Sequence, residues 1–102
     1  AINGHCSGIA AGYHNEIFSN LSGAFIGGGV YNTIRNVDGT SNGHHSSILG
    51  GKCNYMTGSC SSIAGGNQNT LSADFGFVGG GTNHKVNGTG STICFGSQNT
   101  IE

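Results

Sequence analysis

Four side chains in one segment of the chain could form a binding site. Arg35, Asp38, His44 and His45 lie in a stretch that reads RNVDGTSNGHHSS. Charged and imidazole groups on a loop suit contacts with a receptor or a glycan, because loops on rigid scaffolds often carry recognition. Adjacent histidines could also bind a metal if three chains brought their loops together. No carboxylate or cysteine stands at ligand spacing beside them, so we expect no metal, and a solvated bulge without a partner is the plainest alternative.

The remaining reactive side chains do not form recognisable catalytic or metal-binding sets. The four cysteines contain no Cys-x-x-Cys pair and are Cys6, Cys53, Cys60 and Cys94. This spacing does not suggest zinc, so we expect free thiols that fill small spaces. The four carboxylates are Glu16, Asp38, Asp74 and Glu102. Paired acid and base catalysis needs two such groups near one bond. We therefore expect no cofactor and no enzyme activity.

The scaffold that positions these residues is a repeat. The pattern has Ile or Val at position zero, Gly at position three, Asn or His at position six, and an apolar residue at position eight. The six copies begin at Ile9, Ile26, Ile48, Ile63, Val78 and Ile93. The last four copies are fifteen residues apart, while two extra residues follow the first copy and seven follow the second. Similarity at a fixed period is typical of solenoids.

Each unit predicts two short strands, centred on positions zero and eight, and two turns. The recurrent glycine suits a positive φ, and the asparagines suit a turn and could form a hydrogen-bonded column. We expect His14 and His84 to be solvated turn residues. The abundance of Gly, Ser, Thr and Asn argues against a helical repeat. The sequence therefore predicts an all-β protein: one domain, residues 1–102, folded as a parallel β-solenoid of six to seven coils of about fifteen residues.

The alternation of side chains along strands predicts which residues face inward. One buried column should contain the six residues at position zero. The facing column should contain Ile17, Ile34, Met56, Leu71, Val86 and Ile101. An apolar stripe should remain outside, formed by Phe25, Leu49, Ala64, Phe77 and Cys94. Such stripes mark interfaces, so we expect the chain to associate.

Composition narrows the possible partners. Only 34% of the residues are apolar, 21 are Gly and none is Pro, which fits a thin core of small side chains. A net charge of -1 leaves no basic surface for nucleic acid. No apolar run approaches the roughly 20 residues needed to span a bilayer, so we expect no membrane insertion by this segment. The pattern begins and ends within a repeat, so we interpret the chain as a piece of a longer fibre protein.

The motif Ser-x-Ile-x-Gly-Gly-x-x-Asn-x-Ile, repeated from Ser7 to Ile101, resembles the head repeat of trimeric autotransporter adhesins. It is also similar to repeats in tail fibres of bacteriophages and other viruses. The resemblance implies a left-handed β-roll, a homotrimer, and a place in a fibre on a cell surface or virion. It also implies a host-cell surface protein or glycan as partner. The chain differs in having Ile and Asn where such heads favour Ala and Val, and a bacterial or a viral carrier both stay open.

Two other functions are known for β-solenoids. Ice binding needs a regular threonine column, but position seven reads Glu16, Thr33, Tyr55, Thr70, Lys85 and Thr100. A polysaccharide-degrading solenoid enzyme needs clustered carboxylates, and the four acids fall in different columns. We therefore expect a structural and adhesive segment rather than either alternative.

Overall fold

The computed structural model describes residues 7–18, 21–35 and 45–102, which form twelve strands of two residues each. The odd-numbered strands are centred on position zero: Gly8–Ile9 (β1), Phe25–Ile26 (β3), Ser47–Ile48 (β5), Ser62–Ile63 (β7), Phe77–Val78 (β9) and Thr92–Ile93 (β11). The even-numbered strands end at position eight: Glu16–Ile17 (β2), Thr33–Ile34 (β4), Tyr55–Met56 (β6), Thr70–Leu71 (β8), Lys85–Val86 (β10) and Thr100–Ile101 (β12).

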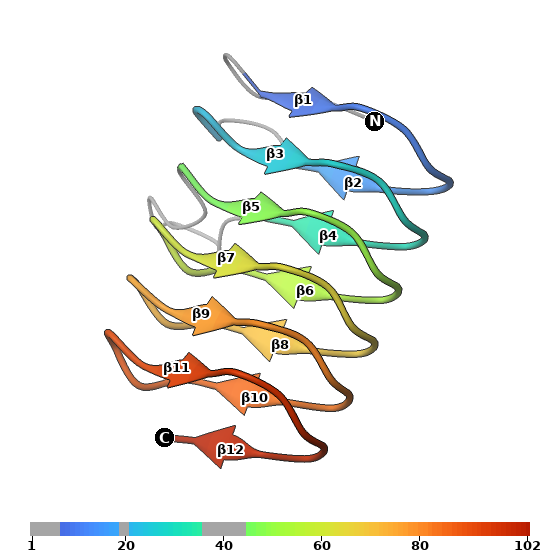
Figure 1. The fold of residues 1–102 in the computed structure, drawn as a ribbon. Coiled ribbons are helices and arrows are strands. Elements are labelled where there is room, and N and C mark those ends of the chain that lie inside the picture. The colour runs from blue at the N-terminus through green and yellow to red at the C-terminus, as the bar shows by residue number, and fades with distance from the viewer. Residues whose placement is uncertain (1–6, 19–20, 36–44) are drawn as a thin grey trace.

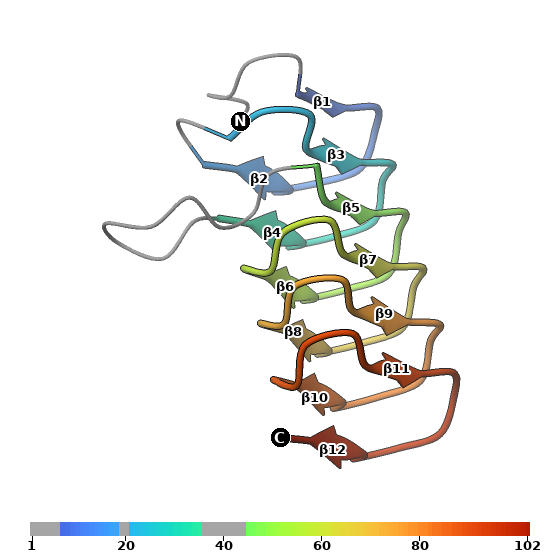
Figure 2. The same ribbon diagram turned by 90° about the vertical axis from the view of Figure 1, so that its left-hand side faces the viewer.

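The strands form two parallel sheets, which confirms the predicted solenoid. One sheet has the order β1-β3-β5-β7-β9-β11, and the other has the order β12-β10-β8-β6-β4-β2. In Figure 1 the odd strands cross the front of the molecule and the even strands return behind them as the chain descends, which is a left-handed course. Figure 2 shows the two sheets side by side, with the odd strands on the right and the even strands on the left. The molecule is flat, with principal extents of 32 × 27 × 16 Å. Each coil therefore consists of one strand from each sheet and two corners that join them.

We name the two corners for what distinguishes them. The glycine corner leads from position two to position seven and contains the recurrent Gly and Asn. The insertion corner leads from each even strand to the next odd strand and contains both sequence insertions. Strand pairing is unaffected by the longer insertion, because Ile26 pairs with Ile48 and Ile34 pairs with Met56. The seven extra residues therefore leave the register of both sheets intact.

The two predicted apolar columns form the core. Ten of their twelve residues are buried, and the exceptions, Ile9 and Ile101, are half-buried in the first and last coils. Leu21, which the periodic pattern did not identify, is also completely buried. It lies five residues before position zero, where coils without an insertion have Gly58 and Ala73, and these two residues are buried as well.

The glycine at position three is required by two features of the backbone. Its φ lies between 92° and 118° in all six copies, as the pattern predicted. In addition, a Cβ on Gly66 would collide with the carbonyl oxygen of Gly81 in the next coil, and the same clash recurs at Gly12, Gly29, Gly51 and Gly81. Only glycine lets adjacent coils approach this closely at the corner.

The asparagines at position six form the predicted ladder, and they do so inside the molecule. The Asn69 backbone N–H donates to Asn54 Oδ1 over 3.1 Å, and the Asn69 side-chain amide donates to the carbonyls of Gly65 and Gly81 over 3.2 Å each. Asn32 and Asn54 make the corresponding bonds in their coils. Each such asparagine, through its backbone N–H and its side-chain amide together, thus bonds to three successive coils, which is why a buried polar column is compatible with this core.

His84 corrects one prediction, because it is buried rather than solvated. It occupies the asparagine position of the fifth coil with only 1% of its surface exposed. Its Nδ1 accepts the N–H of Asn99 over 3.2 Å, as an asparagine oxygen would. Its Nε2 has no hydrogen-bond partner, although it occupies the place where the Asn amide nitrogen donates twice. The imidazole therefore reproduces only half of the asparagine's bonding.

Candidate functional site

Two of the four predicted binding residues are described, and both contact the preceding insertion corner, between β2 and β3. The Arg35 guanidinium carbon lies 4.7 Å from the centre of the Phe18 ring, a cation–π geometry. The backbone N–H of His45 donates to the carbonyl of Ser22 over 2.8 Å. The imidazole of His45 lies over Gly23, where an added Cβ would be 2.7 Å from Nδ1. Asp38 and His44 lie outside the described residues, so their relation to Arg35 and His45 stays a prediction.

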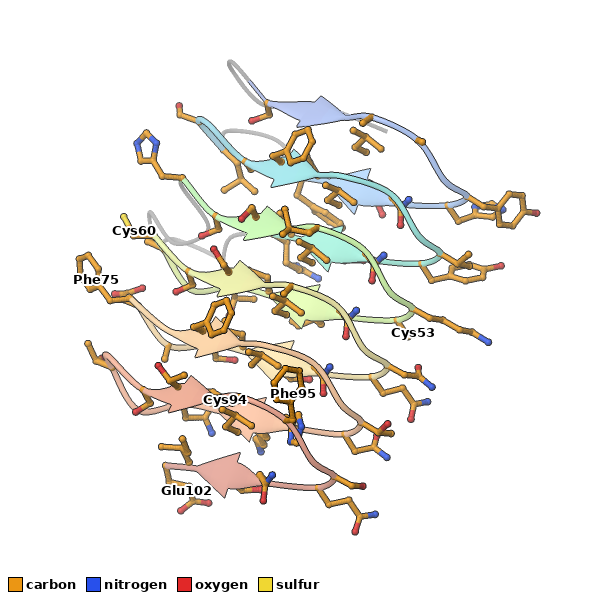
Figure 3. The ribbon with its side chains drawn as sticks, in the orientation of Figure 1. Cys53, Cys60, Phe75, Cys94, Phe95 and Glu102 are labelled. Carbon is orange, nitrogen blue, oxygen red and sulfur yellow. The ribbon has the colours of Figure 1, made fainter. Side chains whose placement is uncertain are left out.

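The predicted apolar stripe lies on the outer face of the odd-strand sheet. Phe25, Leu49 and Phe77 are 39–57% exposed, and glycines and small side chains lie between them on the same face. Cys94, which is also exposed, directly follows β11 at the lower end of this face in Figure 3. The stripe is therefore a nearly flat apolar surface with nothing covering it in one chain.

A second exposed surface, which the sequence did not single out as a site, follows the glycine corner. It consists of the side chains at position five, here called the corner ridge: His14, Tyr31, Cys53, Gln68, Asn83 and Gln98. All six have φ between 53° and 58°, the left-handed conformation that costs a non-glycine residue about 1 kcal/mol. The N–H of each ridge residue from Tyr31 onward donates to the position-four carbonyl of the preceding coil. The repeated backbone bond imposes this conformation, and the side chain points outward.

Aromatic rings cluster at the start of the corner ridge. The rings of His14 and Tyr31 are parallel within 2°, with centroids 5.1 Å apart. Tyr13 meets His14 edge-on at 4.1 Å and Tyr31 edge-on at 6.1 Å. Tyr13 and Tyr31 remain 61% and 52% exposed. His14 is exposed as predicted, but it belongs to a fixed aromatic cluster. The signal in the sequence was that no copy has glycine at position five, although the position is in a turn.

The three described cysteines are free thiols, as the spacing predicted. Cys53 lies at the glycine corner and Cys60 at the insertion corner, so the coil separates them (Figure 3). Within residues 7–18, 21–35 and 45–102, no group of three His, Cys, Asp or Glu side chains could hold a metal ion. The described chain also has no helix long and apolar enough to cross a membrane.

Comparison with known proteins found no matching family model, no similar curated protein and no similar solved structure. The fold is thus identified from its own geometry as a β-solenoid of about six coils of about fifteen residues. The arguments for function rest on the surfaces described above.

Proposed function

We propose that this chain is a segment of a homotrimeric fibre that presents a receptor- or glycan-binding surface outside a cell or on a virion. In this proposal the protein is a scaffold and a binder rather than an enzyme. The observation that carries it is the apolar stripe, because a narrow solenoid with a thin core gains stability by covering such a face. The number three comes from the resemblance of the repeat to trimeric adhesin heads and viral tail fibres.

Assembly is tested by sedimentation equilibrium at micromolar concentration. We expect the intact chain to sediment as a trimer and the double variant Phe25→Ser, Phe77→Ser to dissociate. Phe75→Ser is the matched control, because Phe75 is 68% exposed but lies at the insertion corner, away from the stripe (Figure 3). A monomeric parent chain, or a double variant that associates as strongly as the parent, would contradict the proposal.

The insertion is proposed as one contact with the receptor. It contains Asp38 and His44 and is flanked by Arg35 and His45, which give it charged and imidazole groups. Deletion of residues 37–43 would restore the fifteen-residue step without removing Arg35 or either histidine. Labelled parent and shortened chains can be compared on panels of bacterial and animal cells by flow cytometry. Equal binding by a shortened chain that still folds would exclude Asp38 and the rest of residues 37–43 from the contact.

A further inference from the structure

The corner ridge supports a more specific inference, which rests on the proposed binding role of the fibre. We propose that the corner ridge is a binding site for a neutral polysaccharide that lies along the solenoid axis. The ridge follows the right-hand corner of the coils in Figure 1, and Cys53 marks it in Figure 3. Five of its six side chains are exposed and Cys53 is half-buried, so none of them belongs to the core. Packing within the chain therefore does not explain why large side chains occupy a position that favours glycine.

The upper part of the ridge has the chemistry to pack against sugar rings. A pyranose presents a face of C–H bonds that packs on aromatic rings, and tyrosine adds a hydroxyl that can donate or accept a hydrogen bond. The edge-on and parallel contacts among Tyr13, His14 and Tyr31 fix the three rings relative to one another. Rings that are already ordered lose little conformational freedom when a ligand binds.

The lower part of the ridge has the chemistry to bind hydroxyl groups. Gln68, Asn83 and Gln98 each present an exposed amide, which has two donors and an acceptor. Their backbone N–H groups are already bonded to the preceding coil over 2.8–3.0 Å, so the backbone of each amide residue is held in place. In the described part of the chain no hydrogen bond engages these three side-chain amides. They are therefore available to an external partner.

Charge and spacing indicate a neutral polymer rather than an anion or a small ligand. Across positions four and five of the six coils, Lys52 is the single Lys or Arg and there is no carboxylate. A polyanion would require a denser row of cations. The side chains recur with every coil, at the ~4.8 Å spacing of paired strands, and repeat proteins use such extended surfaces for extended ligands. A chain of hydroxylated sugar rings fits this row of aromatic and amide groups.

The test is affinity electrophoresis of the full chain in gels that contain a neutral polysaccharide. Dextran, galactomannan, xyloglucan and β-glucan are used as probes, and dextran sulfate and alginate are the acidic comparisons. Tyr31→Gly and Gln68→Gly remove ridge side chains at positions where glycine favours the observed φ, so folding is preserved. Phe75→Gly is the matched control, because Phe75 has φ of 57° and is exposed at the opposite corner.

We expect binding to at least one neutral polysaccharide, weakened about tenfold or more by Tyr31→Gly and unchanged by Phe75→Gly. Gln68→Gly should weaken it less. Failure to bind any neutral probe, binding of the acidic probes alone, or equal loss in Phe75→Gly would overturn the inference. The result is separable from the assembly test: a monomer that binds through the ridge contradicts only the fibre, and a trimer without polysaccharide binding contradicts only the ridge.

Discussion

At the glycine corner all six coils have the same length, whereas at the insertion corner the coils differ by as many as seven residues. Both corners turn the chain through a residue in the left-handed conformation, such as Gln68 at one corner and Phe75 at the other. In both, the N–H of that residue donates to a carbonyl of the preceding coil. The shared backbone device therefore does not explain why only one corner accepts insertions.

The two corners differ in the buried contacts that join each coil to the next. At the glycine corner, the backbone of Gly66 packs against that of Gly81, and the buried Asn69 bonds to three coils through its backbone N–H and its side-chain amide.

At the insertion corner the buried polar position holds Ser46 and Ser61, with Ala24 and Gly76 in two other coils. Ser61 Oγ donates to the Ala73 carbonyl over 2.7 Å and accepts the Gly76 N–H over 3.0 Å. The serine lies at the end of the corner, two residues before position zero. Extra residues can therefore be inserted before it without disturbing its hydrogen bonds. Close backbone approach also occurs at the insertion corner, where Gly58 lies against the Ala73 carbonyl, but there it does not recur from coil to coil. We infer that contacts repeated in every coil keep the glycine corner at one length.

The largest expected effect is at the glycine corner, from the variant Gly66→Ala. The new Cβ would meet the Gly81 carbonyl at a φ of 96°, so we expect a loss of about 3 kcal/mol or more in the free energy of unfolding. Gly90→Ala at the insertion corner is the control, because its φ is 73° and nothing lies within 4 Å of the added Cβ. It should cost about 1 kcal/mol. Urea unfolding followed by circular dichroism measures both, and equal losses would remove the distinction between the corners.

The next effect compares the two buried polar columns. Asn69→Ala removes the acceptor of the His84 N–H and two donors to carbonyls, and we expect it to cost about 2–4 kcal/mol. Ser61→Ala removes one hydroxyl and should cost about 1–2 kcal/mol. Thermal unfolding of the two variants under identical conditions gives the difference. A larger loss for Ser61→Ala would assign the main lateral bonding to the insertion corner.

One variant at the glycine corner, His84→Asn, should stabilise the chain. His84→Asn restores the amide of the ladder and replaces the unpartnered Nε2 with a nitrogen that can donate to the neighbouring carbonyls. We expect the free energy of unfolding to rise by about 1 kcal/mol. Asn83→Gln, on the exposed corner ridge next to it, should change stability by less than about 0.5 kcal/mol. A destabilised His84→Asn chain would show that the imidazole fills the site better than an amide does.

The smallest effect belongs to the insertion itself. Deletion of residues 37–43 should change the free energy of unfolding by only about 0.5–1 kcal/mol, because the cost of closing a loop varies slowly with its length. The comparison variant inserts two glycines between Asn67 and Gln68, at the glycine corner, and should unfold the chain or displace the following coils. Hydrogen exchange of the amides in β7 and β9 distinguishes local from global change. An insertion tolerated equally at both corners would contradict the explanation given above.

The sequence predicted those parts of the fold in which identical residues occupy identical positions. The Ile columns, the glycine at position three and the Asn ladder all follow from one period, because stacked coils place like residues together. Leu21 was missed because its position is Gly58, Ala73 and Gly88 in the coils without an insertion, so no recurrent large apolar residue marked it as part of the core. His84 was placed in solvent because imidazole is usually exposed in turns, whereas the ladder buries the residue in its column in every coil before the last.

The candidate sites were less predictable than the fold. Tyr31 and Gln68 have no intrinsic preference for a positive φ, so local propensity did not indicate their conformation. The hydrogen bond that the N–H of each residue donates to the preceding coil imposes it, and that bond becomes visible only when coils are stacked. The insertion could be recognised because it interrupts the fifteen-residue period. The period does not predict the conformation of the inserted residues.

The regular pairing of each coil with the next also bears on how such a chain folds. In the last four coils nearly every hydrogen bond between coils joins residues about fifteen positions apart, as Thr70 N–H and the His84 carbonyl do. Adding coils lengthens the rod but leaves this sequence separation unchanged. Folding rates fall as the separation of contacting residues rises, and repeat arrays fold by propagation between neighbours. A rod of this design can therefore be extended without a matching rise in its kinetic barrier, once the first two coils have formed.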